Sequence, residues 1–207
     1  AVQFKVGHKE DIDSWNLTWD KIVALRNYTS TGIEDMAAGI IPKSSLLPGV
    51  AKTSTLQAGS YIIGFESYHS TSVLKADKFN DYAKKEGLKE VVEYRKDKGL
   101  EGYDGQELYS RKAKAIVQVG ETLTDNVTKP IGHTLEIVPL SHPFTLGEDN
   151  SLTVQVLFKG KPLQDALIDS VPLKNATHET QSFLTDENGQ ATFTFKASGA
   201  VKLNCVW

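Results

Sequence analysis

The sequence predicts an all-β protein made of two β-sandwich-like domains, with a short helical insertion in the N-terminal one. Two observations carry this prediction. Apolar residues alternate with polar ones along many segments, which is the period of two that turns one face of a strand toward a core. Gly and Pro separate these segments at short intervals, as in sandwiches built from short strands. The 207 residues, 40% of them hydrophobic and 24% charged, suffice for one large domain or two small ones.

The N-terminal segments predict strands of uneven regularity. Val2, Phe4 and Val6 alternate with polar residues. Residues 21–29 and 59–68 are rich in the β-branched and aromatic side chains that suit a pleated, half-buried surface. The stretch between those two segments has scattered Gly, Pro, Ser and Thr with little period, so we expect long loops there.

A helical insertion is expected at about residues 76–99. Phe79 and Tyr82 recur at helical spacing after Asp77, a residue type that caps helix N-termini, and Gly87 stands where a left-handed C-cap belongs. A second helix or helical turn follows with the same spacing. Glycines then predict a mobile loop at the end of the insertion.

The strand period returns at Glu107 and continues to Val119, and the side that the pattern buries also carries Glu107 and Arg111. A Pro-Ile-Gly sequence then precedes a new strand that begins at Leu135. We place the domain boundary there. Residues 1–134 are predicted to form the N-terminal β-rich domain, and residues 135–207 an immunoglobulin-like β-sandwich.

The C-terminal part has the clearest strand pattern. Apolar residues alternate over 152–158, over 190–195 and over 201–207, with turns between these segments. Cys205 shares the apolar side of the last segment, so it is predicted to be a buried small hydrophobe and not a nucleophile. Because the strand pattern runs to the last residue, Trp207, we expect the natural protein to continue.

Composition excludes several classes of function. A net charge of -3 and a pI near 6.0 give no positive field for nucleic acid or anionic lipid. No apolar stretch approaches the roughly 20 residues that a membrane-spanning helix needs. The single cysteine excludes an internal disulfide and a thiolate cluster for zinc or iron–sulfur. The sequence lacks nucleophile-elbow, phosphate-loop and His-Glu-X-X-His motifs, so we predict that the protein is not an enzyme.

Six blocks follow one another along the chain at residues 59–65, 78–82, 86–88, 107–114, 135–139 and 160–163. Together they resemble a domain-of-unknown-function family described as a nickel-uptake substrate-specific region, whose members are periplasmic proteins linked to nickel and cobalt import. The resemblance implies export to the periplasm or cell envelope after removal of a signal peptide, a β-rich fold, and a membrane transport component or envelope protein as partner. It implies no catalysis.

Members of that family typically begin the mature chain with His and a nearby aromatic residue. This chain opens Ala1-Val2-Gln3-Phe4, so an N-terminal histidine site is not carried over.

The remaining metal candidates are His8 and His69. His8 is followed by Glu10, Asp11 and Asp13, and a histidine with carboxylates can hold a divalent transition metal. His69 ends an apolar strand, from which it could face a cleft. The alternatives are a solvated acidic loop for the first group and a surface histidine for the second.

A second candidate site is ionic. A buried guanidinium needs a partner, because an isolated buried charge costs several kcal/mol. Arg111 is therefore predicted to pair with Glu107, Glu86 or Glu93, which would tie the insertion to the sheet. The functional alternative is that Arg111, together with Arg95, binds a carboxylate or other anion in a forked geometry.

These observations favour a non-enzymatic, exported binding protein, accessory to transition-metal uptake. The alternative is a structural or adhesive cell-envelope module that binds a protein or glycan through loops or strand edges. A hydrolase would need two carboxylates in a cleft, or a base beside a hydroxyl, and no residues stand out for either role.

Overall fold

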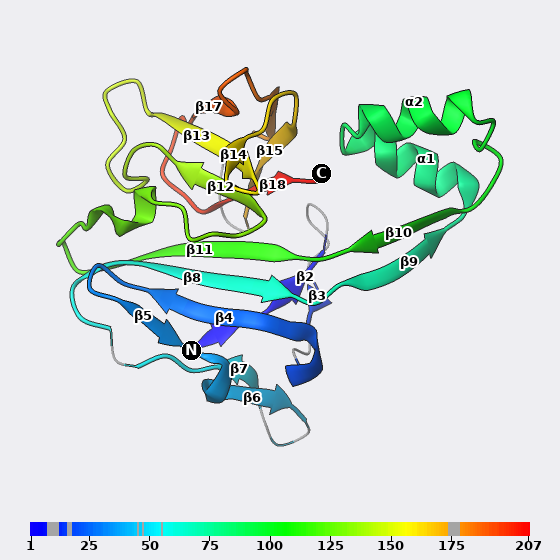
Figure 1. Ribbon diagram of the computed structural model, residues 1–207. Coiled ribbons are helices and arrows are strands. Elements are labelled where there is room, and N and C mark those ends of the chain that lie inside the picture. Colours follow the sequence, from blue (N-terminus) through cyan, green and yellow to red (C-terminus); the bar gives the residue numbers. More distant parts are fainter. Residues whose placement is uncertain (8–12, 16–17, 45, 47, 55, 174–178) are drawn as a thin grey trace.

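The structure is a computed structural model that describes residues 1–207 except 8–12, 16–17, 45, 47, 55 and 174–178. The chain is mostly β, with 44% of the described residues in strands and 15% in helices, and its strands form several antiparallel sheets (Figure 1). This confirms the predicted mainly β, sandwich-like class. None of the described helices has the length and apolar character needed to cross a membrane.

The first sheet is four-stranded and runs in the order β11-β8-β4-β5. Its central strand β8 (Gly59–Ser67) pairs with β11 (Lys112–Val119) on one side and with β4 (Ile22–Tyr28) on the other. Both β4 and β8 confirm strands predicted from β-branched and aromatic content. Leu25 and Phe65 lie in the core that this sheet covers, together with Met36.

Residues 30–58 are not the long loops that we predicted. They form β5 (Ile33–Asp35), β6 (Ile40–Lys43) and β7 (Pro48–Ala51), and β6 and β7 join β1 (Val2–Gln3) in a small sheet beside the first core. Strands of three or four residues are too short to display a period of two. The other short elements of this part are β2 (Lys5–Val6), β3 (Asp13–Ser14) and 3₁₀ turns at Trp19–Lys21, Ala37–Gly39 and Asp125–Thr128.

A long ribbon leaves the first sheet and ends in two helices (Figure 1). Its strands are β9 (Ser70–Leu74) and β10 (Gly105–Tyr109), and the helices are α1 (Ala76–Lys85) and α2 (Lys89–Asp97). We call residues 70–109 the helical arm. The predicted insertion is therefore confirmed, although it has a β-ribbon at its base.

Two details of the helices differ in their agreement with the prediction. Gly87 has a φ of 73° directly after α1, the left-handed C-cap that was expected. Asp77 is not the N-cap. Lys75 occupies that position, and its side chain makes no capping hydrogen bond; Asp77 lies in the first turn, where its negative charge interacts favourably with the helix dipole.

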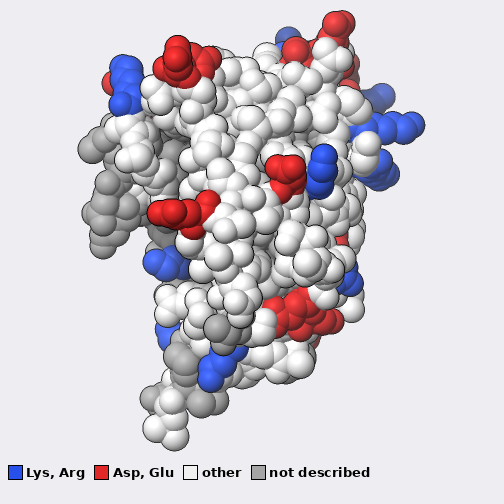
Figure 2. Space-filling model, turned by 90° about the vertical axis from the view of Figure 1, so that its left-hand side faces the viewer, with Lys and Arg blue, Asp and Glu red and all other residues white. Residues whose placement is uncertain are grey.

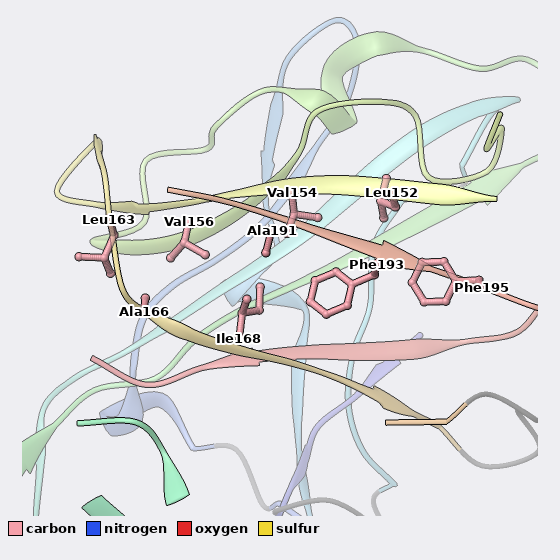
Figure 3. Packing of buried hydrophobic residues seen from close by; sticks show 9 residues of the cluster. All are labelled: Leu152, Val154, Val156, Leu163, Ala166, Ile168, Ala191, Phe193 and Phe195. Carbon is pink, nitrogen blue, oxygen red and sulfur yellow. The ribbon is translucent and has the colours of Figure 1, made fainter. Parts of the chain in front are cut away.

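The C-terminal strands form two sheets that enclose a second core. Strand β13 (Ser151–Phe158) pairs with β12, β14 and β17. Strand β15 (Leu167–Pro172) pairs with β16 and β18. Figure 3 shows Val154 of β13 and Phe193 of β17 pointing toward Ile168 of β15. The remaining bounds are β12 (Leu135–Pro139), β14 (Lys161–Pro162), β16 (Gln181–Leu184), β17 (Gln190–Thr194) and β18 (Val201–Cys205).

Within the described residues, strands β12 to β18 pair only with one another. The domain boundary between residues 134 and 135 stays a prediction, because side chains also link the two parts, as described next.

Candidate functional site

The structure describes only some of the predicted metal ligands. His8, Glu10 and Asp11 lie outside the described residues, and Asp13 is described only through its backbone, which pairs with Val6. His69 is exposed between β8 and β9. In the part of the chain that the structure describes, no three His, Cys, Asp or Glu side chains converge as metal ligands would. The metal site stays a prediction.

Arg111 is exposed, so its predicted burial is wrong. It lies between β10 and β11, which are two strands and not the single strand predicted over 107–119. Ser67 holds the break, because its N–H donates to the Arg111 carbonyl and its Oγ accepts the Arg111 N–H at 2.8 Å. The interruption resets the alternation of side chains, and the guanidinium turns out of the core.

The Arg111 guanidinium is held by aromatic rings. Its Cζ lies 4.5 Å from the centroid of the Tyr109 ring and 5.7 Å from that of Trp15, within the range of cation–π attraction. Trp15 in turn contacts Phe65 edge-on, with centroids 5.5 Å apart. The arrangement anchors the base of the helical arm on the first core.

Glu107 and Glu86, two of the predicted partners of Arg111, lie near Tyr82 of α1. Burial raises the pKa of Tyr82 to about 12, and Glu107 and Glu86 add to that rise while Arg111 opposes it. Arg111, Glu107 and Glu86 are therefore all near enough to Tyr82 for their charges to act on its pKa. Arg111 nevertheless forms no ion pair among the described residues.

The same region is the junction of the arm with the C-terminal sheet. Asn204 Nδ2 lies 3.4 Å from Glu86 Oε2, and a Cβ added to Gly87 would come within 2.7 Å of the Leu167 side chain. Cys205, which packs partly buried against the second core, has a pKa raised to about 12 by burial and by the Glu86 and Asp169 charges. Its thiol stays protonated and unreactive at neutral pH.

Arg95 is buried, and no carboxylate of the described residues forms an ion pair with it. Its Nε donates to Asn80 Oδ1 at 2.8 Å, and one terminal nitrogen donates to the carbonyls of Leu100 and Tyr103 at 2.8 and 2.6 Å. Its Cζ lies 4.7 Å from the Phe79 ring centroid. Neutral acceptors satisfy the charge, so Arg95 clamps α1, α2 and the following turn together and is not available to an outside anion.

Sequence reasoning missed a buried ion pair that joins the two parts of the molecule. Lys114 Nζ on β11 lies 2.8 Å from Glu136 Oε1 on β12, and both side chains are largely buried. The same carboxylate accepts the N–H groups of Ile131, Gly132 and His133 at 2.7 to 3.0 Å. A glutamate on the inward side of a strand, two residues before buried Val138, was the signal available.

The electrostatics favour the charged form of Glu136, whereas burial outweighs the Glu136 charge at Lys114 and lowers the pKa of that amine. Burial alone would raise the pKa of Glu136, but Lys114 and the backbone N–H donors outweigh it, so the pKa of that carboxyl is lowered. Burial lowers the pKa of neighbouring His133, against the opposing effect of Glu136 and Glu66. The cluster is enclosed, so it connects β11 to β12 and offers little to a ligand.

The helical arm instead exposes an apolar surface. The side chains of Thr71, Val73, Gln106 and Leu108 share one face of the β9–β10 ribbon, and Val73 and Leu108 are 63% and 68% exposed. A depression of about 310 Å³ follows this face. The opposite face is covered by α1, because Phe79 lies directly over Gly105, where even a Cβ would clash. Sequence reasoning could not tell which face the helix would cover.

The fold and these sites define a β-rich protein with a projecting arm, and the comparisons give its family. A family model described as "Domain of unknown function (DUF4198)" matches residues 34–207. The chain therefore belongs to this family. Neither the comparison with curated proteins nor that with solved structures found a match.

Proposed function

We propose that the chain is a non-enzymatic binding protein of the bacterial periplasm or cell envelope whose helical arm holds an extended strand of a partner protein. The exposed apolar face of the β9–β10 ribbon carries this proposal. Solvent-exposed Val73 and Leu108 gain from burial, at roughly 25 cal/mol per Å² of apolar surface removed from water.

The edges of the ribbon also favour a strand as the occupant. Among the described residues, β9 pairs only with β10 and β10 only with β9. Each outer edge therefore presents backbone N–H and C=O groups to an added strand, and alternate side chains of that strand would meet the apolar face.

The arm is braced before any partner arrives. The Arg95 clamp holds its tip, and Lys75 Nζ lies 2.9 Å from Asp104 Oδ2 across the junction of the ribbon and α1. A brace of this kind lowers the ordering cost of binding.

The resemblance described above suggests what the partner does. A periplasmic protein linked to nickel and cobalt import would dock on a membrane transport component, and we include this accessory role in the proposal. In the same proposal, residues 135–207 form an immunoglobulin-like sandwich that serves as the platform for the arm.

The test places a photoreactive amino acid at Val73 and, as a matched control, at Val23, which is exposed on β4 outside the arm. In intact cell envelopes we expect one specific cross-linked product from position 73 that is absent from position 23. The change Leu108→Asp should abolish it without changing the melting temperature. Identical products at both positions would contradict the proposal.

Direct metal capture needs a separate test, motivated by His8 and the acidic residues after it. Calorimetric titration with nickel, cobalt, copper and zinc should show binding that His8→Ala weakens and Glu121→Gln leaves unchanged. The absence of binding tighter than about millimolar, a ΔG° of about -4 kcal/mol, would remove direct capture and leave the accessory role to the arm.

A further inference from the structure

The end of the molecule opposite the helical arm carries a second exposed apolar surface. The loops that contain residues 119–128 and 140–150 lie there, at the left of Figure 1. They expose Leu123, Leu140 and Phe144 by 42%, 44% and 52%. We call these two loops the loop-end surface. Figure 2 looks onto this side and shows mostly uncharged surface with scattered acidic and basic side chains.

A hydrogen-bond network under the surface fixes both loops to the first sheet. Buried Ser60 of β8 is its centre: Ser60 Oγ donates to Gln118 Oε1 at 2.6 Å, accepts the Thr124 N–H at 3.0 Å, and lies 2.9 Å from His142 Nε2. Thr124 and His142 thus meet at one atom. Leu123 directly precedes Thr124, and the Phe144 and His142 rings are tilted with their centroids 5.9 Å apart.

Further bonds hold each loop in shape. In the first loop, Gln118 Nε2 donates to the Thr122 carbonyl at 2.9 Å, and Asn126 Nδ2 donates to the Ser60 carbonyl at 3.0 Å. In the second loop, the Thr145 N–H donates to the His142 carbonyl at 3.0 Å. The apolar side chains therefore stand on a rigid base, unlike those of a flexible loop. A preformed surface loses little entropy when it binds.

The Ser60–His142 contact does not resemble a nucleophile with its base. His142 Nδ1 accepts the Phe144 N–H at 3.3 Å, so the proton of the neutral ring is on Nε2, which donates to Ser60 Oγ. The Ser60 hydroxyl proton is used by Gln118. A base would have to accept from the serine, and this histidine donates to it.

Charge decides which partner fits. The two loops contain Glu121, Asp125, Glu148 and Asp149, and neither contains Lys or Arg. Four carboxylates on the two loops that expose the apolar side chains disfavour anionic lipid and attract a surface of the opposite sign. The complement is an apolar stripe flanked by Lys or Arg.

We propose that the loop-end surface is a second protein-binding site, and that its partner contributes a basic amphipathic segment. The apolar side of that segment covers Phe144 and Leu123, and its Lys or Arg side chains meet the acidic residues around them. This site is independent of the one on the helical arm, so the protein can hold two partners at opposite ends.

The test uses the whole chain and a fluorescent peptide of about 14 residues, roughly four helical turns, with Leu on one side and Lys on the other. A matched peptide has Glu in place of Lys. Fluorescence anisotropy should show binding of the Lys peptide at least about tenfold tighter than of the Glu peptide, and the difference should shrink with added salt.

Three variants locate the site. Phe144→Asp should weaken binding of the Lys peptide about tenfold or more, whereas Val73→Asp on the arm should have no effect. The charge reversal Glu121→Lys with Glu148→Lys should shift the preference toward the Glu peptide. These side chains are exposed, so circular dichroism should show an unchanged fold.

Several outcomes would overturn the proposal. Equal affinity for the two peptides, or undiminished binding to Phe144→Asp, would remove this site while leaving the proposal for the arm intact. A molar mass that rises with protein concentration and falls in Phe144→Asp would show that a second copy of the chain is the occupant.

Discussion

The C-terminal sandwich and the helical arm are stabilised in opposite ways. In the sandwich, nine apolar side chains from β13, β15, β17 and neighbouring segments are buried against one another (Figure 3). In the arm, Arg95 is buried beside Phe79 and Ala83, and large apolar groups such as Val73 and Leu108 face the solvent. The comparison teaches that polar clamping leaves apolar surface free for a partner, whereas a packed core does not.

The largest expected effect is in the sandwich. Phe193→Ala removes a fully buried ring and should lower the free energy of unfolding by about 3–5 kcal/mol. Leu108→Ala in the arm should change it by no more than about 0.5 kcal/mol, because that side chain is exposed. Urea unfolding of both variants measures the contrast, and similar losses would break it.

The second largest effect on the free energy of unfolding should come from the Lys114–Glu136 ion pair. Glu136→Leu leaves buried Lys114 without its carboxylate and should cost about 3 kcal/mol. The double variant with Lys114→Met should recover most of this loss. As a control, Asp104→Asn breaks an ion pair at the exposed base of α1 and should have a much smaller effect. A double variant no more stable than the single one would show that charge compensation is not what matters here.

The hydrogen bonds of Arg95 should contribute less to the free energy of unfolding, and their effect should be confined to the arm. Arg95→Met removes three charged hydrogen bonds, with an expected cost of about 2 kcal/mol. Amide hydrogen exchange should become faster in residues 76–104 and remain unchanged in β13. Lys96→Met, on the exposed side of the same helix, is the matched control. Loosening that spreads equally into β13 would mean that the arm and the sandwich are one cooperative unit.

The smallest effect should be a pH dependence. Burial lowers the pKa of His133 and of His142, so the unfolded chain binds protons more readily than the folded one. The two histidines contribute fully to the free energy of unfolding above their usual pKa of 6.5, and this contribution is lost as the pH falls from there toward their lower pKa in the folded protein. Stability at about pH 5.5 should therefore be lower than at about pH 7.5, and His133→Gln should reduce the difference. His69→Ala, at an exposed site, should not reduce it.

Much of the fold could be predicted where each strand faces one core. The alternation over 152–158 identified β13, and Gly87 marked the end of α1 with its positive φ. Residues 30–58 gave no such signal, because β5, β6 and β7 are too short to show a period. The identity of the covered ribbon face depended on where α1 folds back, which is a tertiary contact that no local pattern encodes.

The candidate sites were harder to predict for the same reason. The pattern suggested that Arg111 and Glu107 form a buried pair, and the charges of both act on Tyr82, but the break at Ser67 turned Arg111 outward. Lys114 and Glu136 lie on strands of different sheets, so only the fold reveals their pairing. The loop-end surface combines loops that are separate in sequence and meet at Ser60.

The register between β8 and β11 indicates that the helical arm could be replaced without disturbing the first sheet. Strands β8 and β11 align Glu66 with Lys112 and remain paired to Gly59 and Val119, all below the point where the arm begins. The arm is thus an elaborate turn at the tip of one hairpin. Exchanging it for another sequence, or for a short turn, would change which molecule the protein recognises while the framework beneath kept its alignment.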